Sequence, residues 1–284
     1  MKILLVGADG QLGSEILKAY DSGVTPLSHR DIEIADAEQA GAAVIAAAPE
    51  TVINTAAYHN LPDCERDPET AFRVNVLGTR NLALACRKAG ARLVHVSTDY
   101  VFDGRKTSPY SEDDVPRPLN VYGVSKAAGE FFVPAAGRWL TVRTSSLYGV
   151  RGSRAKGGRN FVKTMLLAAA SKPALDVSAN IVSSPTYARD AARRIKELLD
   201  SDAPSGVYHV ANGGACSWYE FALEIFRQAG RTVEVRPRVE TEEAEGIRRP
   251  LYTPLASIKL EPLRPWREAL RDYLGEEGAL AQEG

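Results

Sequence analysis

The amino-acid sequence predicts an α/β fold in which helices cover both faces of a parallel sheet. Strand-like and helix-like segments alternate through the first half of the chain, and a glycine-rich turn follows the first strand directly. Strands separated by full-length helices form βαβ units, whose strands run parallel. The segments Lys2–Val6 and Arg92–Ser97 are also apolar almost throughout, as in strands buried on both faces. These observations predict a doubly wound parallel sheet.

The first half carries this prediction element by element. We expect strands over Lys2–Val6, Val24–Leu27, Thr51–Thr55 and Arg92–Ser97, and helices over Gln11–Tyr20, Ala37–Ala48 and Glu69–Ala89. Pro49 ends the second of these helices because proline cannot donate a backbone hydrogen bond. Gly90 ends the third because glycine readily adopts the left-handed conformation of a helix terminus.

The second half is less regular. We expect helices over Val121–Ala136, Phe161–Ala170, Tyr187–Leu199 and Trp218–Ala229, strands over Trp139–Thr144 and Val207–Val210, and a flexible loop rich in Gly, Arg and Lys over Gly149–Asn160. This change predicts a large α/β domain over residues 1–150 and a smaller domain over 151–284. Segments near 181–211 are expected to return to the large domain.

Charge and cysteine content limit the kinds of partner. The 284 residues include 35 Lys+Arg and 36 Asp+Glu, a net charge of -1, so neither nucleic acid nor an anionic membrane surface is expected. No stretch reaches the roughly 20 apolar residues of a membrane-spanning helix. The cysteines Cys64, Cys86 and Cys216 are odd in number and far apart, which favours free thiols in a reducing cytoplasm.

A glycine-rich turn indicates a dinucleotide site. Gly7, Gly10 and Gly13 recur at every third residue between the first strand and the first helix. Small residues there let the chain turn sharply and let its backbone approach a pyrophosphate, which the free N–H groups of the helix N-terminus can bind. A purely structural turn is the alternative.

The residues after the second strand bear on the choice between NAD and NADP. An acidic residue there would bind the ribose hydroxyls of NAD, but the chain reads Leu27-Ser28-His29-Arg30. The Arg30 guanidinium is suited to a bidentate contact with the 2′-phosphate of NADP. We therefore favour NADPH over NADH, with an ordinary solvated arginine as the alternative.

Tyr122 and Lys126 form a candidate acid–base pair. They lie one turn apart on one face of the helix expected from Val121. A tyrosine, with a reference pKa of about 10, is a weak acid at neutral pH, but a neighbouring ammonium stabilises its phenolate. The hydroxyls of Ser97, Thr98 and Tyr100 lie at the carboxyl end of the strand that begins at Arg92, where ligands of open α/β sheets bind. One of them would complete a hydroxyl–Tyr–Lys triad. An exposed helix pair and a capped strand end are the alternatives.

The order of several motifs resembles one enzyme family. In chain order, the motifs are G-A-D-G-Q-L-G, N-T-A-A-Y, S-T-D-Y-V-F-D-G, P-L-N-V-Y-G-x-S-K-x-x-G-E and R-T-S-x-L-Y-G. The segments Asn160–Met165, Ser184–Ala188 and Arg249-Pro250 come after them. They resemble the dTDP-4-dehydrorhamnose reductase family of extended short-chain dehydrogenases. The resemblance implies a Rossmann-type NAD(P)-binding domain over 1–150 and a mainly substrate-binding domain over 151–284. It also implies NAD(P)H-dependent reduction of the 4-keto group of a nucleotide-linked deoxysugar, dTDP-4-dehydrorhamnose to dTDP-rhamnose.

The resemblance carries the family's roles to matched positions. It implies that Thr98 steadies the substrate carbonyl, that Tyr122 donates the proton, and that Lys126 also holds the nicotinamide ribose. Cofactor contacts are implied, besides Arg30, at Gly7, Gly10, Gln11, Leu12, Gly13, Ala56, Ala57 and Tyr58. Tyr100 and Phe102 are expected close to the sugar, Asn160 at the nucleotide side, and Arg249 near the diphosphate.

The sugar-side residues depart from the family pattern. Ser146 stands where a tryptophan is common, Asn180–Ser183 replaces D-Q-x-G, and His59–Pro62 replaces a small hydroxyl followed by V-D. We expect no metal, because Arg189 occupies a place where an acidic ligand would be wanted. His59, His95 and His209 do not change this, since they are scattered over separate elements without ligand spacing.

Two other functions stay open. One is a sugar-nucleotide epimerase or dehydratase of the same superfamily, although dehydratases add an acidic pair and here Tyr100 follows Asp99. The other is a non-catalytic NADP-binding regulatory subunit resembling the β subunit of methionine adenosyltransferase. The expected partner is a small sugar nucleotide, and a homodimer is left open.

Overall fold

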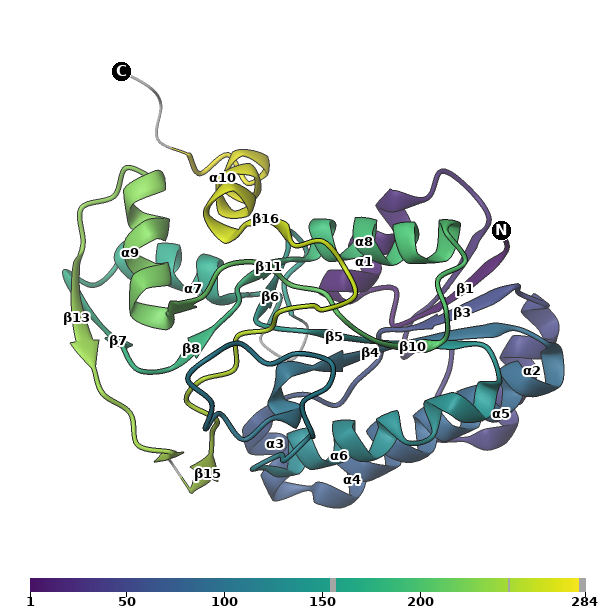
Figure 1. Ribbon diagram of the computed structural model, residues 1–284. Coiled ribbons are helices and arrows are strands. Elements are labelled where there is room, and N and C mark those ends of the chain that lie inside the picture. Colours follow the sequence, from purple (N-terminus) through teal and green to yellow (C-terminus); the bar gives the residue numbers. More distant parts are fainter. Residues whose placement is uncertain (154–156, 245, 281–284) are drawn as a thin grey trace.

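A six-stranded parallel sheet forms the centre of the molecule (Figure 1). The structure, a computed structural model, describes residues 1–153, 157–244 and 246–280. The sheet order is β10-β5-β4-β3-β1-β2. Its strands are β1 Ile3–Val6, β2 Val24–Leu27, β3 Thr51–Asn54, β4 Arg92–Thr98, β5 Trp139–Thr144 and β10 Gly206–His209. The chain leaves β1 towards β2 and then crosses to β3 on the other side. This reversal confirms the expected doubly wound sheet and places its ligand crevice at the carboxyl ends of β1 and β3.

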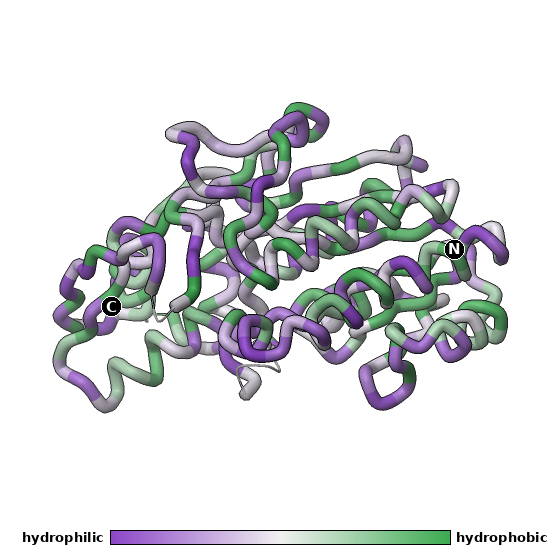
Figure 2. Tube along the Cα trace, turned by 90° about the horizontal axis from the view of Figure 1, so that it is seen from below, coloured by the Kyte–Doolittle hydropathy of each residue, from purple (hydrophilic) through white to green (hydrophobic). Residues whose placement is uncertain are grey.

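Helices cover both faces of this sheet, as Figure 1 shows. The helices are α1 Gln11–Ala19 and α8 Ala188–Asp200 on one face, and α2 Ala37–Ala47, α5 Thr79–Ala89 and α6 Val121–Glu130 on the other. Ile3 and Leu5 are buried in the core with α1 and α8, whereas Leu4 and Val6 are buried in the core with α2 and α5. Apolar and polar residues alternate along the helices seen in Figure 2. None of the described helices is long and apolar enough to cross a membrane.

The long helix expected over Glu69–Ala89 is interrupted. It consists of α4 Pro68–Phe72, a π-helical turn over Arg73–Gly78 and α5. Crowding accompanies the π turn, because a Cβ on Gly129 of α6 would lie 2.4 Å from the carbonyl oxygen of Asn75. The helix expected over Val121–Ala136 likewise ends at Glu130 and is followed by a 3-10 turn, Val133–Ala136. Pro134 in that turn cannot continue an α-helix.

The C-terminal part packs around a core of its own. Its helices are α7 Phe161–Ala169, α9 Trp218–Gln228 and α10 Trp266–Glu276. Its strands form five two-stranded pairs: β6 Leu147–Tyr148 with β9 Thr186–Tyr187, β7 Ala174–Ser178 with β13 Glu234–Arg238, β8 Val182–Ser183 with β12 Cys216–Ser217, β11 Asn212–Gly213 with β16 Leu263–Pro265, and β14 Glu243–Ala244 with β15 Ile247–Arg248. Tyr148, Tyr187, Phe221 and Tyr273 meet in this core through ring contacts. Between these elements the chain returns to the main sheet through α8 and β10. Residues 154–156 of the loop expected over Gly149–Asn160 lie outside the described residues.

Candidate active site

A cavity of about 740 Å³ opens where β1, β3, β4 and β5 end. One wall belongs to the main sheet and its loops and includes Gly10, Gln11, Ala57, Thr98, Tyr122 and Lys126. The opposite wall belongs to the C-terminal part and includes Ser153, Arg159, Phe161 and Trp218. The helix α3, Leu61–Arg66, contributes Leu61 and Asp63 at the rim. The cavity therefore lies at the position where doubly wound sheets bind their ligands.

The glycine turn forms one end of the cavity. Gly7 has φ +82°, and a Cβ there would lie 2.6 Å from Thr55 Oγ1. A Cβ on Gly13 would lie 2.3 Å from the carbonyl oxygen of Gly7, so α1 packs too closely on the turn for any side chain. Gly10 caps α1 without a side-chain hydrogen bond, and Gly10, Gln11 and Leu12 line the cavity. The first N–H groups of α1 are thus placed to bind an anionic group.

Buried polar atoms without partners lie along the same wall. Among the described residues, Ser97 Oγ, Thr144 Oγ1 and Gln11 Oε1 are buried and make no hydrogen bond, and all three residues line the cavity. Such atoms are costly unless a ligand or water satisfies them. Together with the glycine turn they fit a polar dinucleotide such as NAD(P).

Tyr122 lies near the start of α6 and contacts Thr98 of β4. Asn120 caps this helix by accepting a hydrogen bond from the Gly123 N–H at 2.9 Å. The side chain of Thr98 interacts with the Tyr122 hydroxyl across the cavity wall. Burial raises the pKa of Tyr122, and the Thr98 contact opposes the rise. The phenol is therefore in its protonated form at neutral pH, as a proton donor must be.

Lys126 follows Tyr122 by one turn of α6 and is buried, only 1% exposed. Its ammonium donates to the Val96 carbonyl at 2.8 Å and meets His95 Nε2 at 3.1 Å. Burial lowers the pKa of Lys126 to about 8, with Glu130 opposing the shift. The amine is therefore mainly charged at pH 7 and can stabilise a developing phenolate.

Two asparagines that the sequence reasoning missed fix the turn after β3. Asn54 Oδ1 accepts from the Ala56 N–H at 3.1 Å. Asn75 in the π turn accepts from the Tyr58 N–H at 2.9 Å and donates to the Tyr58 carbonyl at 2.8 Å. Ala56, Ala57 and Tyr58 all line the cavity, as the family resemblance implied. A polar residue in the apolar middle of a helix was the available signal for Asn75.

The residues after β2 are divided between cavity and solvent. Ser28 and His29 line the cavity, whereas Arg30 is exposed and is not among the lining residues. An acidic residue, Asp31, follows directly after Arg30. Its carboxylate accepts hydrogen bonds from the Ser28 N–H and hydroxyl, both at 2.7 Å. These contacts lower the pKa of Asp31 and engage its carboxylate locally.

The expected sugar-side residues are placed unequally. Tyr100 lines the cavity and lies edge-on to Tyr122, with ring centroids 5.9 Å apart. Phe102 is fully buried outside the cavity lining and stacks on Tyr110 at 4.2 Å. Arg249 is half-buried outside the lining and interacts electrostatically with Tyr100. Only Tyr100 of these three thus reaches the cavity directly.

Asn160 touches the cavity but is occupied by the fold. Its Oδ1 accepts from the Lys163 N–H at 2.9 Å and caps α7. Its Nδ2 donates to the Gly149 carbonyl at 2.8 Å and to the Tyr273 hydroxyl at 3.0 Å. The residue therefore ties the loop after β6 to α7 and α10, so it would act on a ligand by holding this loop in place.

The C-terminal wall contains side chains that the sequence reasoning did not select. Phe161 and Trp218 face one another with ring centroids 4.4 Å apart, and both line the cavity. His59, one of the departures from the family pattern, forms a hydrogen bond from Nε2 to Ser153 Oγ at 3.0 Å. This bond joins the two walls. No sequence signal marked Trp218, since an aromatic residue at a helix start is ordinarily part of the core.

Arg189, expected from the sequence at a place where an acidic metal ligand would be wanted, forms ion pairs with two glutamates. Its guanidinium contacts Glu276 and lies 3.6 Å from Glu15. Among the described residues, no group of His, Cys, Asp and Glu is arranged to hold a metal ion.

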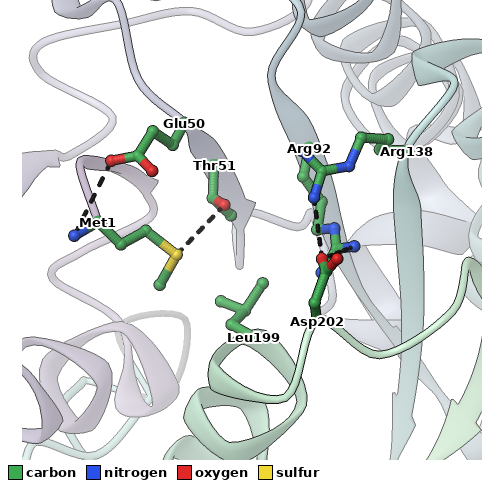
Figure 3. A pocket seen from close by; sticks show the side chains of 7 residues that line it. All are labelled: Met1, Glu50, Thr51, Arg92, Arg138, Leu199 and Asp202. Atoms are coloured by element: carbon green, nitrogen blue, oxygen red, sulfur yellow. Dashed lines mark hydrogen bonds and ion pairs between the residues drawn. The ribbon is translucent and has the colours of Figure 1, made fainter.

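A second pocket of about 180 Å³ lies at the opposite end of the sheet (Figure 3). There Asp202 accepts from Arg92 at 2.6 Å and from Arg138 at 2.9 Å. These pairs join the starts of β4 and β5 to the turn after α8. The pocket is therefore a structural ion-pair cluster far from the glycine turn.

Comparisons with known proteins match the whole chain. The RmlD substrate binding domain family matches residues 1–278. The spore coat polysaccharide biosynthesis protein SpsK of Bacillus subtilis (strain 168) is 39% identical over 283 residues, 97% of this chain and 97% of that protein. A dTDP-4-dehydrorhamnose reductase of Streptomyces griseus is 38% identical over 286 residues, 95% of this chain and 91% of that protein.

A solved structure agrees with these relatives. The crystal structure of a dTDP-4-dehydrorhamnose reductase from Bacillus anthracis in complex with NADP superposes with a TM-score of 0.91 at 34% identity and covers 97% of this chain and 100% of that one. The matches confirm the expectation of a nicotinamide-dependent oxidoreductase. The chain belongs to the dTDP-4-dehydrorhamnose reductase family, whose RmlD domain extends over almost its whole length.

Proposed function

We propose that this protein reduces the 4-keto group of a dTDP-linked deoxysugar with NADPH, converting dTDP-4-dehydrorhamnose to dTDP-rhamnose. The observation that carries the proposal is that Thr98, Tyr122 and the buried Lys126 line one cavity together with the glycine turn. The relatives named as dTDP-sugar reductases support the substrate class, and the NADP-bound neighbour supports the cofactor.

The two walls divide the binding tasks. We assign the cofactor to residues 1–150, where Gly7, Gly10, Gln11, Leu12 and Gly13 would hold the pyrophosphate and Arg30 the 2′-phosphate. Residues 151–284 would mainly hold the sugar nucleotide, with 181–211 returning to the sheet. The buried free thiols of Cys64, Cys86 and Cys216 support a reducing, cytoplasmic setting.

The proton chemistry follows from the sheet wall. When bound, the nicotinamide cofactor supplies a hydride to the carbonyl carbon. Tyr122 donates its phenolic proton to the carbonyl oxygen, so that the keto group becomes a hydroxyl and the phenol a phenolate. Lys126 stabilises this phenolate by its charge, and Thr98 holds the reacting oxygen in place.

The test is oxidation of NADPH and of NADH by the purified protein with dTDP-4-dehydrorhamnose generated in situ. We expect turnover with a lower KM for NADPH than for NADH. A different keto sugar is the second candidate, favoured by the His59–Ser153 contact and by Ser146, which replace the family's usual residues. Turnover of another dTDP-keto sugar, but not of dTDP-4-dehydrorhamnose, would select it. Cofactor binding without turnover of any keto sugar would favour a regulatory subunit.

A further inference from the structure

Asp99 carries a buried carboxyl that the proposed mechanism does not use. It follows Thr98 at the end of β4, opens the 3-10 turn Asp99–Val101 and is 3% exposed. A buried carboxylate is ordinarily paired with a cation, because burial without compensation is costly. In the described part of the chain, no Lys, Arg or His forms an ion pair with Asp99. Its only side-chain partners there are hydroxyl groups.

These hydroxyls come from three segments of the chain. Thr98 Oγ1 lies 3.1 Å from Oδ1 of Asp99. Ser145, just after β5, donates to Oδ2 at 2.9 Å, and Thr253, from the C-terminal part, donates to the same oxygen at 2.6 Å. The Ser145 hydroxyl oxygen also accepts from the Ser184 N–H at 3.4 Å, so its single hydrogen is directed to Asp99. Oδ2 is therefore saturated with donors, and Oδ1 faces Thr98 alone.

Counting hydrogens around Thr98 gives two arrangements. The Thr98 oxygen already accepts from the Tyr100 N–H at 3.2 Å. If Asp99 is ionised, Thr98 gives its only hydrogen to Oδ1 and has none for the cavity side. If Asp99 is protonated on Oδ1, it donates to Thr98 instead. The Thr98 hydrogen is then free for the cavity side, which Tyr122 also lines.

We propose that Asp99 is a positioning residue whose protonated carboxyl donates to Thr98 and thereby frees the Thr98 hydrogen to point towards the substrate carbonyl. The inference rests on the proposed function only in naming the carbonyl as the target. Burial raises the pKa of Asp99, and the three hydroxyl contacts oppose the rise without cancelling it. The titratable groups that interact with Asp99 are the phenols of Tyr100 and Tyr122, while the β5 and C-terminal sides contribute only hydroxyls.

The test compares Asp99→Asn with Asp99→Ala. The asparagine amide can donate to Thr98 and still accept from Ser145 and Thr253, so it reproduces the protonated carboxyl. We expect kcat of Asp99→Asn within about threefold of the parent, and a loss of about 10–100-fold in Asp99→Ala. As pH rises, the parent should lose rate as Asp99 ionises and again as Lys126 loses its proton, whereas Asp99→Asn should keep only the second loss. Equal damage in both variants, or an unchanged pH profile in Asp99→Asn, would overturn the proposal.

A second readout does not depend on turnover. A carboxyl whose pKa is higher in the folded than in the unfolded state contributes stability at low pH that is lost as pH rises through the folded value. In the parent protein, the free energy of unfolding should therefore fall as pH rises through the pKa of Asp99. In Asp99→Asn this fall should be absent. Asp103→Asn is the matched control: the pKa of Asp103 is lowered, so its stability contribution is lost as pH falls. If no keto sugar is reduced but the decline disappears in Asp99→Asn, the proposed function fails and the protonation of Asp99 stands.

A variant pair keeps the test open if Asp99→Asn does not fold. The hydroxyls of Ser145 and Thr253 donate to Oδ2 and stabilise the ionised carboxylate of Asp99. Ser145→Ala and Thr253→Val each remove one of these donors. Both should move the first loss of rate, and the decline in stability, to higher pH. A shift of either to lower pH would contradict the proposal.

Discussion

The two walls of the cavity differ in how firmly their side chains are fixed. On the sheet wall, Thr98, Asp99 and Lys126 are buried and are hydrogen-bonded to β4 or its flanks. On the C-terminal side, Phe161 and Trp218 are only half-buried, and Arg159 is exposed. In the proposed function the first wall carries the reaction, because its geometry is fixed by many partners. The second can change without disturbing the sheet, and we propose that it contributes to the choice of substrate.

The departures from the family pattern that line the cavity lie on loops of the sheet wall. His59 is exposed and Ser146 half-buried, so both can change without disturbing the buried strands. The residues of the glycine turn have no such freedom, since a single Cβ on Gly13 would clash with the backbone. Substitutions on the sheet wall should therefore remove turnover, whereas substitutions on the other wall should change substrate affinity.

Apart from loss of the Tyr122 hydroxyl itself, loss of the Lys126 charge should have the largest effect. We expect Lys126→Met to lower kcat about 100-fold or more, because the phenolate of Tyr122 would lose its stabilising charge. In the parent protein kcat should fall as pH rises through about 8, where burial places the pKa of Lys126. The measurement is the pH profile of kcat for both proteins. A parent rate that increases steadily above that pH would contradict the assignment.

A methyl group in the glycine turn should disturb the sheet wall next most strongly. Gly13→Ala places a Cβ 2.3 Å from the Gly7 carbonyl oxygen, which should cost about 1–3 kcal/mol of stability and weaken cofactor binding. Gly41→Ala in α2 is the matched control, because no atom lies within 4 Å of its added Cβ. That variant should gain about 0.5–1 kcal/mol from the lower unfolded-state entropy. Urea unfolding and cofactor titration of both variants measure this contrast.

Substitutions on the C-terminal wall should change the KM for the sugar nucleotide. Trp218→Ala removes one ring of the Phe161–Trp218 pair, and we expect the KM for the sugar nucleotide to rise about tenfold with kcat little changed. Phe131→Ala serves as a control, since that ring is 82% exposed and is not among the cavity residues. A Trp218→Ala variant that lost kcat at unchanged KM would remove the distinction between the two walls.

The smallest expected effect concerns the choice of cofactor. Arg30→Ala should raise the KM for NADPH about three- to tenfold and leave that for NADH unchanged, because only NADPH carries the 2′-phosphate. The ratio of the two KM values is the relevant measurement. An equal change for both cofactors would show that Arg30 is an ordinary surface residue.

The sheet wall was largely predictable because its signals are local. The strand, turn and helix over Ile3–Ala19 are marked by an apolar run and by glycine spacing, and the pairing of Tyr122 with Lys126 is one helical turn. What escaped prediction depends on contacts between distant residues. Thr253 reaches Asp99 across 154 positions of sequence, and no local pattern encodes such a contact.

The same reason explains the differences in the helices and on the opposite wall. Asn75 lies within what reads as one long helix, and only its packing against α6 and the Tyr58 turn produces the π turn. Phe102 was expected near the sugar, yet its apolar ring is buried against Tyr110 instead. That Phe102 lies close to the sugar stays a prediction.

The central claim is that Tyr122 on the sheet wall delivers the proton to the keto group. Its most direct test is single-turnover reduction of dTDP-4-dehydrorhamnose by Tyr122→Phe, together with cofactor titration of the same variant. We expect the reduction rate to fall by about 10²–10⁴-fold while cofactor affinity stays within about twofold, because only the proton donor is removed. A variant that reduced the sugar at the parent rate, or that lost cofactor affinity as much as rate, would contradict the account.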